Sequence, residues 1–566
     1  MVNRRSLTAR RPCMRHTRLC GLLRYLMLSA IASACGDNTS APKEPADAIK
    51  IGVGETRAID PSAAPIVHVS GGAAGAEYTL VGFAAPEGPV ITMQVAADNV
   101  IEAVGPPNPT RVATTLSTTR SVLSGPFQAG ADLHLSSIDR ERLASRLGAV
   151  RRTLVARAQV TPVIPAVGDE LTLNVSLDAC GPPVLHTARV VDVSVHAVLV
   201  EDELNPSGGF SADDYQSIAD EYETLILPVL SDNFGVPSDI DNNGGRTIVL
   251  FTRAVNELTP PGGSGFITSF FYVRDLIPKT ACAGSNEAEL LYLMAPDPSG
   301  EINGQVWSAT DTRTKVGISL AHSGQHLVNQ SRRLYVTHAP IEATWVEEGM
   351  SDIAQELVFY RASALAAKRN LSLDDLLAAD AIRDAVNTYQ GANLLRLQVY
   401  LANTESYAPT SGDGSLETSG AAWELLRYLA DRSAVPERTI WNTLVNGATT
   451  GIANLATATG LDVAAAERDW AVAQYTDDAG IPVSATLQEP SWNFRSVLPG
   501  LHNDLGFPLA PHVLASSSPL SLRLERGGAT YLRFGVSAGQ YATIHVPLSN
   551  PQTMSQYLSL TLVRTK

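Results

Sequence analysis

The stretch Leu320-Ala-His-Ser-Gly-Gln-His326, followed by Thr344-Trp-Val-Glu-Glu-Gly-Met-Ser-Asp-Ile-Ala354, indicates both a fold and a chemistry for this chain. His322 and His326 are four residues apart, so on a helix both rings leave the same face and can bind one metal ion. Glu348 follows on a second predicted helix. Two histidines and a carboxylate with a fourth position open form the ligand set of a catalytic zinc site. We therefore expect these three residues to bind zinc.

Two further positions refine this prediction. Asp352 lies one helical turn after Glu348, where its carboxylate can accept a hydrogen bond from the far nitrogen of a ligand histidine. In the His-Glu-x-x-His motif of zinc peptidases, the glutamate is the general base that takes a proton from the zinc-bound water. That position is Ser323 here, and a serine hydroxyl is a very poor base near neutral pH. The ligand set is complete, whereas the base is missing.

The segment resembles the gluzincin metallopeptidases, and most closely the hyicolysin-type neutral metallopeptidases. Those proteins carry His-Glu-Phe-Gln-His and then Trp-Leu-Asn-Glu-Gly-Leu-Ser, in which the glutamate before glycine is the third zinc ligand. The residues that match the ligands and their context are His322, His326, Glu348, Gln325, Trp345, Gly349 and Ser351. The departures are Ser323 for Glu, Gly324 for Phe and Glu347 for Asn. The resemblance covers about residues 200–365.

This resemblance implies a zincin-like α+β domain that binds zinc and a protein or peptide ligand. Two functions remain open: a zinc-binding pseudopeptidase, and an active extracellular metalloendopeptidase with a non-standard base such as Glu347 or Glu342. A structural surface lipoprotein without a metal is a third alternative. Gluzincins also take an electrophilic Tyr or His from the lobe after the motif. The candidates for that role here are Tyr389, Tyr400 and Tyr407.

The amino terminus predicts export. Residues 1–34 contain seven Arg and no acidic residue, and an apolar run over residues 22–31 leads into Ala32-Ser-Ala34 and Cys35. This pattern resembles a bacterial lipoprotein signal that is cleaved before Cys35, which would carry a lipid anchor to the membrane. An ordinary cleavable signal with an incidental cysteine is the alternative. The first interpretation places the protein in the bacterial cell envelope or on its outer surface.

Composition favours a folded, acidic protein. The apolar content of 45% and the charged content of 17% are typical of globular chains. The formal net charge is −15, and without residues 1–34 only 35 basic residues remain against 57 acidic ones. Binding to nucleic acid needs a basic face, so we do not expect a nucleic-acid partner.

The cysteines agree with export. Loss of the signal and lipidation of Cys35 would leave Cys180 and Cys282. In an oxidising compartment, two remaining cysteines predict one disulfide. Two buried free thiols are the alternative.

A second metal motif precedes a predicted strand. The run Asp239-Ile-Asp241-Asn-Asn243-Gly matches the first half of an oxygen-rich calcium loop, which makes Asp239, Asp241 and Asn243 candidate calcium ligands. Position 12 of such a loop would be Leu250 rather than Glu. A polar turn before the strand is therefore the alternative.

Local patterns predict individual elements of the central domain. Apolar residues alternate over 191–199, which predicts one strand with one buried face. Ser211 and Asp214 resemble a capping box, and Pro228 should kink or end the helix that follows. Further strands are predicted at 247–251 and 289–293.

The periodicity changes from two to 3.6 and back along the chain, which predicts several domains. The expected fold class is a multidomain protein with an α+β zincin-like metallopeptidase domain flanked by N- and C-terminal all-β sandwich domains. The expected segments are a signal peptide (1–34), a tether (35–47), a β-sandwich (48–110), a connector with a helix at 138–152 (111–166), the metallopeptidase-like domain (167–480) and a C-terminal β-sandwich (481–566).

Overall fold

A computed structural model of the protein describes residues 44–103 except 64, 130–131, 148, 154, 161–262, 266–411, 414–501, 506–516, 518–547 and 556–566. The predicted signal peptide, Cys35 and nearly all of the predicted connector helix lie outside these residues. Among the helices that are described, none combines the length and the hydropathy needed to cross a membrane.

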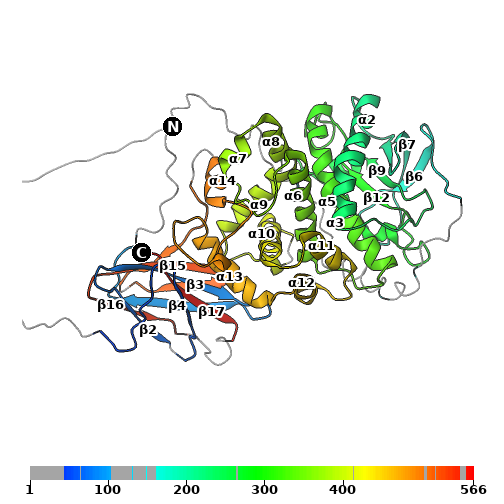
Figure 1. The fold of residues 1–566 in the computed structure, drawn as a ribbon. Helices are drawn as coiled ribbons and strands as arrows, with labels where there is room; N and C mark the ends of the chain where they lie inside the picture. Colours follow the sequence, from blue (N-terminus) through cyan, green and yellow to red (C-terminus); the bar gives the residue numbers. More distant parts are fainter. Residues whose placement is uncertain are drawn as a thin grey trace, which may run out of the picture. The chain divides into compact units, whose positions relative to one another are not determined.

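Strands from both ends of the chain form two sheets packed on one apolar core (Figure 1). The strands are β1 (Thr56–Ile59), β2 (Ile66–Ser70), β3 (Ala76–Ala84), β4 (Ile91–Asp98), β13 (His512–Val513), β14 (Leu520–Leu524), β15 (Ala529–Val536), β16 (Tyr541–His545) and β17 (Leu558–Arg564). One sheet has the order β1-β17-β3-β15-β13, and the other has the order β14-β4-β16-β2.

This arrangement differs from the expected pair of separate sandwiches, because β3 pairs with both β15 and β17. Alternation along a strand shows which face is buried, but it does not show which strand lies beside it. Strands are present in both segments expected to be sandwiches, and together they form one sandwich.

A six-stranded sheet lies in the central part of the chain, and its order is β11-β12-β9-β8-β7-β6. Its strands are β6 (Glu170–Asn174), β7 (Leu185–Val193), β8 (Ala197–Asp202), β9 (Thr247–Phe251), β11 (Ser269–Phe271) and β12 (Leu290–Leu293). Strands β8, β9 and β12 are parallel, mainly apolar and almost entirely buried, which is typical of strands covered on both faces. Strand β11 is antiparallel at one edge. A separate parallel pair joins β10 (Phe266–Ile267) to β5 (Gly130–Ala131).

The single strand predicted at 191–199 is wrong: β7 and β8 form an antiparallel pair with a turn between them. Ser194 holds this turn, since its N–H donates to Ala197 O at 2.9 Å and its Oγ accepts from Ala197 N at 3.0 Å. Val195 continues the alternation but is 66% exposed at the tip. Periodicity alone does not reveal such a turn, because the apolar pattern continues through it.

Helices cover the sheet and form the lobe that follows it. They are α2 (Ala212–Glu221), η2 (Tyr222–Ile226), α3 (Leu227–Asn233), α4 (Arg253–Asn256), η3 (Val273–Leu276), α5 (Ala309–Tyr335), α6 (Thr344–Ser363), α7 (Leu373–Leu377), α8 (Asp380–Ala385), η4 (Val386–Gln390), α9 (Gly391–Leu401), η5 (Pro409–Ser411), α10 (Leu416–Arg432), α11 (Glu437–Asn446), α12 (Gly451–Thr459), α13 (Val463–Thr476), η6 (Ala485–Leu487) and α14 (Phe494–Leu501). The predicted capping box at Ser211 and Asp214 begins α2, and a π-helical turn precedes Pro228.

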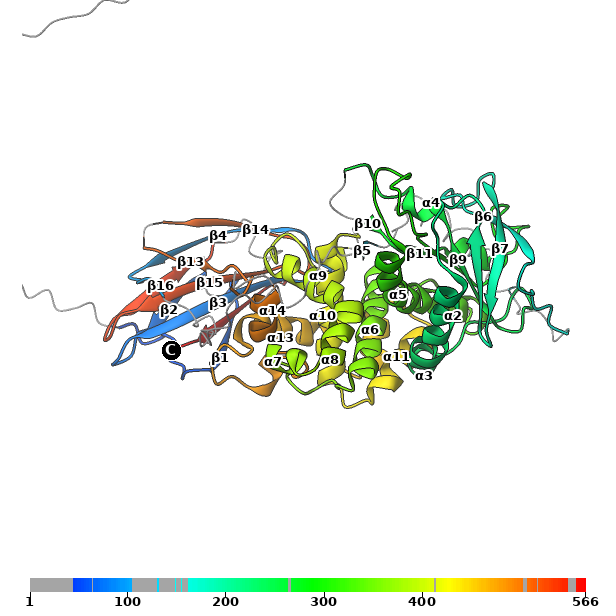
Figure 2. The ribbon, with the colours of Figure 1, turned by 90° about the horizontal axis from the view of Figure 1, so that it is seen from above.

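Two of these helices position the predicted metal ligands. Helix α5 packs against β11 and β12 on one side and against α6 on another (Figure 2). The predicted disulfide is confirmed, since Cys180 and Cys282 are bonded with their Cα atoms 4.9 Å apart. It ties the loop after β6 to the loop before β12 and so braces the sheet on which α5 rests.

Candidate metal centre

The predicted zinc ligands converge at the junction of α5 and α6. His322 and His326 lie one turn apart on α5, and Glu348 lies in the first part of α6. The two Nε2 atoms are 3.1 Å apart, and they lie 3.5 and 3.6 Å from Glu348 Oε2. Donors bound tetrahedrally at about 2.0–2.2 Å from zinc are roughly 3.3–3.6 Å apart. The triangle of donor atoms therefore has the size that a zinc ion requires.

A carboxylate lies beside the other nitrogen of each ring. Asp352 Oδ1 is 3.2 Å from His322 Nδ1, and Glu347 Oε1 is 3.4 Å from His326 Nδ1. At His326 the carboxylate favours a proton on Nδ1, which leaves Nε2 available as a metal donor. At His322 the amide nitrogen of Gln355 lies 2.9 Å from Nδ1 and competes with Asp352 for that nitrogen. The sequence predicted this position for Asp352, but it did not predict it for Glu347.

Buried donors hold these two carboxylates in place. Arg396 Nη1 donates to Asp352 Oδ1 at 2.8 Å, and Asn393 Nδ2 donates to the Asp352 carbonyl at 2.9 Å. Gln330 Nε2 donates to Glu347 Oε1. Arg396 comes from α9, so no spacing around the motif could have indicated its role. The rings are thus oriented by three helices.

The site also favours a positive charge. Burial lowers the pKa of His326, but the carboxylates of Glu348 and Glu347 outweigh this effect and raise the pKa to about 9. In the absence of a metal ion, the ring therefore carries a proton at neutral pH. A metal ion would have to replace that proton, which couples metal binding to pH.

Ser323 occupies the place of the general base and is fully buried. Its Oγ lies 3.0 Å from Ser269 Oγ on the edge strand β11, within hydrogen-bond distance. The neighbouring Gly324 is a packing residue, because a Cβ there would lie 2.8 Å from Leu230 Cδ1 on α3. The small side chain of Ser323 and the missing side chain of Gly324 thus allow α5 to pack closely against β11 and α3.

The two glutamates considered as substitute bases have other roles. Glu347 faces His326 Nδ1, as described above. Glu342 accepts hydrogen bonds from Gly451 N at 2.6 Å and from Asn454 Nδ2 at 2.7 Å, and it pairs with Arg333 at 3.3 Å. Glu342 therefore fixes the loop before α6 to α12.

The structure does not single out one tyrosine for an electrophilic role. Tyr389 donates its hydroxyl proton to Glu221 on α2. Tyr400 is fully buried, accepts from Gln474 at 3.3 Å and stacks on Trp470. Tyr407 is partly buried. The side-chain contacts of Tyr389 and Tyr400 are explained by packing within the helical lobe.

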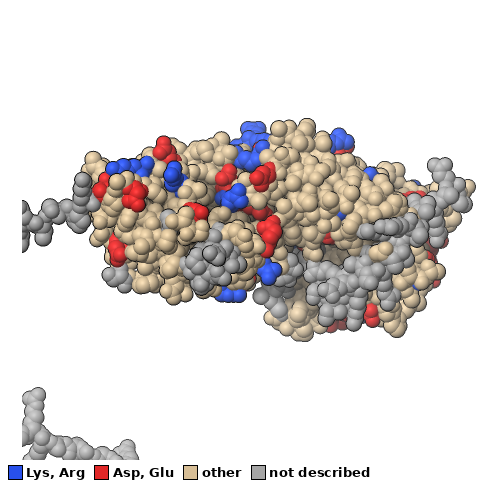
Figure 3. Space-filling model, turned by 90° about the horizontal axis from the view of Figure 1, so that it is seen from below, with Lys and Arg blue, Asp and Glu red and all other residues tan. Residues whose placement is uncertain are grey.

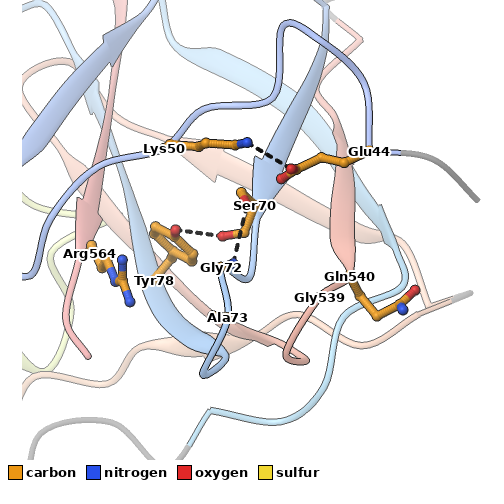
Figure 4. Close-up of a pocket in the computed structure, with 9 residues that line it drawn as sticks. All are labelled: Glu44, Lys50, Ser70, Gly72, Ala73, Tyr78, Gly539, Gln540 and Arg564. Carbon is orange, nitrogen blue, oxygen red and sulfur yellow. Dashed lines mark hydrogen bonds and ion pairs between the residues drawn. The ribbon is translucent and has the colours of Figure 1, made fainter.

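A separate cavity of about 360 Å³ lies in the β-sandwich (Figure 4). Lys50 Nζ pairs with Glu44 Oε2 at 2.8 Å, and Tyr78 donates to Ser70 O at 2.7 Å. The Lys50–Glu44 ion pair and the hydrogen bond of Tyr78 to the backbone occupy polar groups of the cavity wall, and we assign the cavity no chemistry. The convergent donors lie on α5 and α6 instead.

Comparison with known proteins supports a distant and partial similarity to a neutral metalloprotease. The chain is 29% identical over 121 residues to neutral metalloprotease ShpI of Staphylococcus hyicus. The aligned part is 21% of this chain and 25% of ShpI, so the chain spans about a quarter of that relative's length. No protein-family model matches the chain. Together with the donor triangle, this similarity is consistent with a zinc site of the metallopeptidase kind.

Proposed function

We propose that this protein is an exported, lipid-anchored zinc-metallopeptidase-like protein that binds a peptide or protein ligand with little or no hydrolysis. The observation that carries the proposal is the combination of an intact donor triangle with Ser323 at the position of the general base. A missing general base typically reduces a rate by about 10²- to 10⁴-fold.

The residues have separate roles in this proposal. His322, His326 and Glu348 would hold zinc, while Asp352 and Glu347 would keep the Nδ1 protons in place. When bound, zinc supplies a Lewis acid that polarises a carbonyl group and acidifies water. A neutral hydroxyl is a very weak base, so Ser323 cannot serve as the proton acceptor.

An active metalloendopeptidase with a non-standard base is the second candidate. It would need a carboxylate near the two Nε2 atoms in addition to Glu348. Glu347 faces the opposite side of His326, and Glu342 is bound to Arg333 and α12. These positions favour the pseudopeptidase. A metal-free structural lipoprotein would leave the buried donor triangle without a role.

Ligand binding and location complete the proposal. Strand β11 is an edge strand beside α5, and such an edge can pair with an extended peptide through backbone hydrogen bonds. On the face shown in Figure 3, acidic and basic side chains of the described residues are interspersed, so charges of one sign do not dominate among them. The disulfide supports an oxidising compartment. Lipidation at Cys35 remains part of the proposal.

The test compares zinc content and casein cleavage in the wild type and three variants. Wild type should contain about one zinc per chain and should cleave casein slowly or not at all. Ser323→Glu should raise cleavage by up to about 10²- to 10⁴-fold. Ser323→Ala, which removes the hydroxyl without adding a base, should leave cleavage as in wild type. His322→Ala should lose zinc.

Two results would contradict the proposal. Rapid wild-type cleavage that is abolished in His322→Ala would identify an active peptidase. Absence of zinc after purification in zinc-replete medium would remove both metal-dependent functions. Mass spectrometry of the mature chain from the native host should show a lipid on Cys35, and an unmodified cysteine would exclude the anchor.

A further inference from the structure

The loop before β9 and the residue before β12 bring three carboxylates together, away from the zinc ligands. Strands β9 and β12 are adjacent and parallel, with Ile248 paired with Leu290. The residues that precede the two strands therefore lie at one edge of the sheet. Asp239 and Asp241 precede β9, and Glu289 immediately precedes β12. One carboxylate oxygen from each lies within 4.8 Å of the others.

Hydrogen bonds satisfy only one oxygen in two of these carboxylates. Glu289 Oε1 accepts from Ile240 N at 2.7 Å, and Asp239 Oδ2 accepts from Gly245 N at 3.0 Å. Glu289 Oε2 and Asp239 Oδ1 are buried and have no hydrogen-bond partner in the part of the chain that is described. Glu289 is only 1% exposed, so water cannot readily solvate its second oxygen. A buried carboxylate oxygen without a partner is costly, and a bound cation would remove that cost.

We propose that Asp239, Asp241 and Glu289 bind one calcium ion. All three donors are carboxylate oxygens, which hard cations prefer, whereas the zinc centre offers two imidazole nitrogens. Calcium accepts six to eight oxygens at about 2.3–2.6 Å in flexible geometry, so opposite ligands are separated by roughly 5 Å. Magnesium demands a nearly ideal octahedron with shorter bonds. Two acidic donors from an irregular loop, together with Glu289, therefore fit calcium better than magnesium.

The third ligand in this proposal is Glu289, whereas the sequence predicted Asn243. Asn243 Oδ1 accepts from Arg246 N at 2.7 Å, and Asn243 Nδ2 donates to Arg246 O at 2.7 Å. The same amide donates to Asp241 Oδ2 at 3.0 Å. Asn243 therefore closes the turn and orients Asp241, while Glu289 completes the acidic cluster. Glu289 could not be found from the loop motif, because it lies before a different strand, about 50 residues later in the sequence.

Two observations support this assignment. Three ionised carboxylates with oxygens within 4.8 Å of one another repel each other, and a bound cation would remove this repulsion. The loop also contacts the helix that carries the zinc ligands, since Ser238 N donates to Ser331 Oγ on α5 at 2.8 Å. A calcium ion would hold this loop against α5.

The experiment uses the full chain, loaded with zinc and freed of calcium by dialysis. Calcium is titrated to about 10 mM, above the dissociation constants of roughly 10⁻⁴–10⁻³ M known for extracellular calcium modules. Binding is measured by equilibrium dialysis, and the melting temperature is recorded in parallel. Glu289→Gln removes the buried charge at almost constant size. Asp213→Asn is the matched control, because Asp213 is an exposed acid in the first turn of α2.

Wild type and Asp213→Asn should bind about one calcium ion and melt at a higher temperature with calcium than without it. Glu289→Gln should bind calcium at least tenfold more weakly, yet melt no lower than wild type without calcium, since its amide oxygen can still accept from Ile240 N. Wild-type-like binding by Glu289→Gln, or an equal response to magnesium, would overturn the proposal. His322→Ala should keep the calcium response, so loss of the zinc site and loss of this site are distinguishable.

Discussion

Replacement of Asp352 by Asn tests whether the carboxylate beside His322 Nδ1 strengthens zinc binding. Asp352 is fully buried, and its Oδ1 lies between His322 Nδ1 at 3.2 Å and Arg396 Nη1 at 2.8 Å. The amide keeps the size of the side chain but loses its charge. Replacing a residue that orients a metal ligand typically weakens binding by about 10- to 100-fold. We therefore expect a loss of about 1.4–2.8 kcal/mol in zinc-binding free energy.

The same change should also lower the free energy of unfolding. Breaking a buried ion pair costs about 3–5 kcal/mol, because it leaves a charge without its partner. Arg396 is only 4% exposed, but it keeps Asn393 Oδ1 at 2.9 Å and Gln355 Oε1 at 3.3 Å as acceptors. We therefore expect a loss near the lower end, about 3 kcal/mol.

The assays are a competitive zinc titration against a coloured chelator and urea unfolding of the zinc-free chain. Asp431→Asn provides the matched control, because Asp431 is a buried acid paired with Arg427 at 3.3 Å and hydrogen-bonded by Ser491 at 2.6 Å. It should lose stability while its zinc affinity remains unchanged. Unaltered zinc affinity in Asp352→Asn would refute the reasoning. So would an equal loss of affinity in Asp431→Asn, which would indicate a general effect of lower stability.

Three other properties can be checked by unfolding experiments. Replacing Cys180 and Cys282 with Ala should lower the free energy of unfolding in urea by about 4–5 kcal/mol, because the disulfide closes a loop with a sequence separation of 102; an unchanged midpoint would contradict this. Burial is the main cause that raises the pKa values of Glu424 and Asp477 to about 8. Their contribution to stability is therefore full below their unfolded pKa values near 4 and is lost as the pH rises through about 8, so the urea midpoint should fall over this window. Gly420→Ala should cost about 1–3 kcal/mol in urea unfolding, because its Cβ would lie 2.3 Å from a backbone carbon of α9, and a neutral result would show that α9 and α10 can separate.

The metal centre was predictable because helix geometry pairs residues within each helix and the motif context links the two helices. Residues four apart on one helix must share a face, which placed His322 with His326 and Glu348 with Asp352. The roles of Glu347 and Arg396 depend on how helices pack, and neither has a spacing that reveals its partner. Glu347 carried one weak signal, since it replaces the Asn of the resembling motif directly before the third ligand.

In the sheets, too, local sequence patterns predicted individual strands but not their pairing. The local pattern located β9 and β12 but not β6 or β11 of the same sheet, and β3 pairs with strands more than 400 residues away in the sequence. Alternation also continued through the turn at Ser194, where exposure of Val195 in the folded chain contradicts the pattern. Alternation of apolar residues shows which face of a strand is buried. Which strand lies beside it depends on tertiary contacts, and a short stretch of sequence does not contain that information.

The charges around the candidate metal centre link the proposed absence of a base to the proposed binding of zinc. Glu347, Glu348 and Asp352 contribute three negative charges when ionised, and Arg396 contributes one positive charge beside Asp352. A divalent zinc ion would balance the remaining two, and neutrality is strongly favoured where side chains are buried. A glutamate at position 323 would add a fourth carboxylate whose charge the zinc ion would not balance. Such a carboxylate can accept a proton, as a general base does. In the proposed pseudopeptidase, the neutral hydroxyl of Ser323 lies within hydrogen-bond distance of Ser269, and the charges around it would suit a bound cation better than the transfer of a proton.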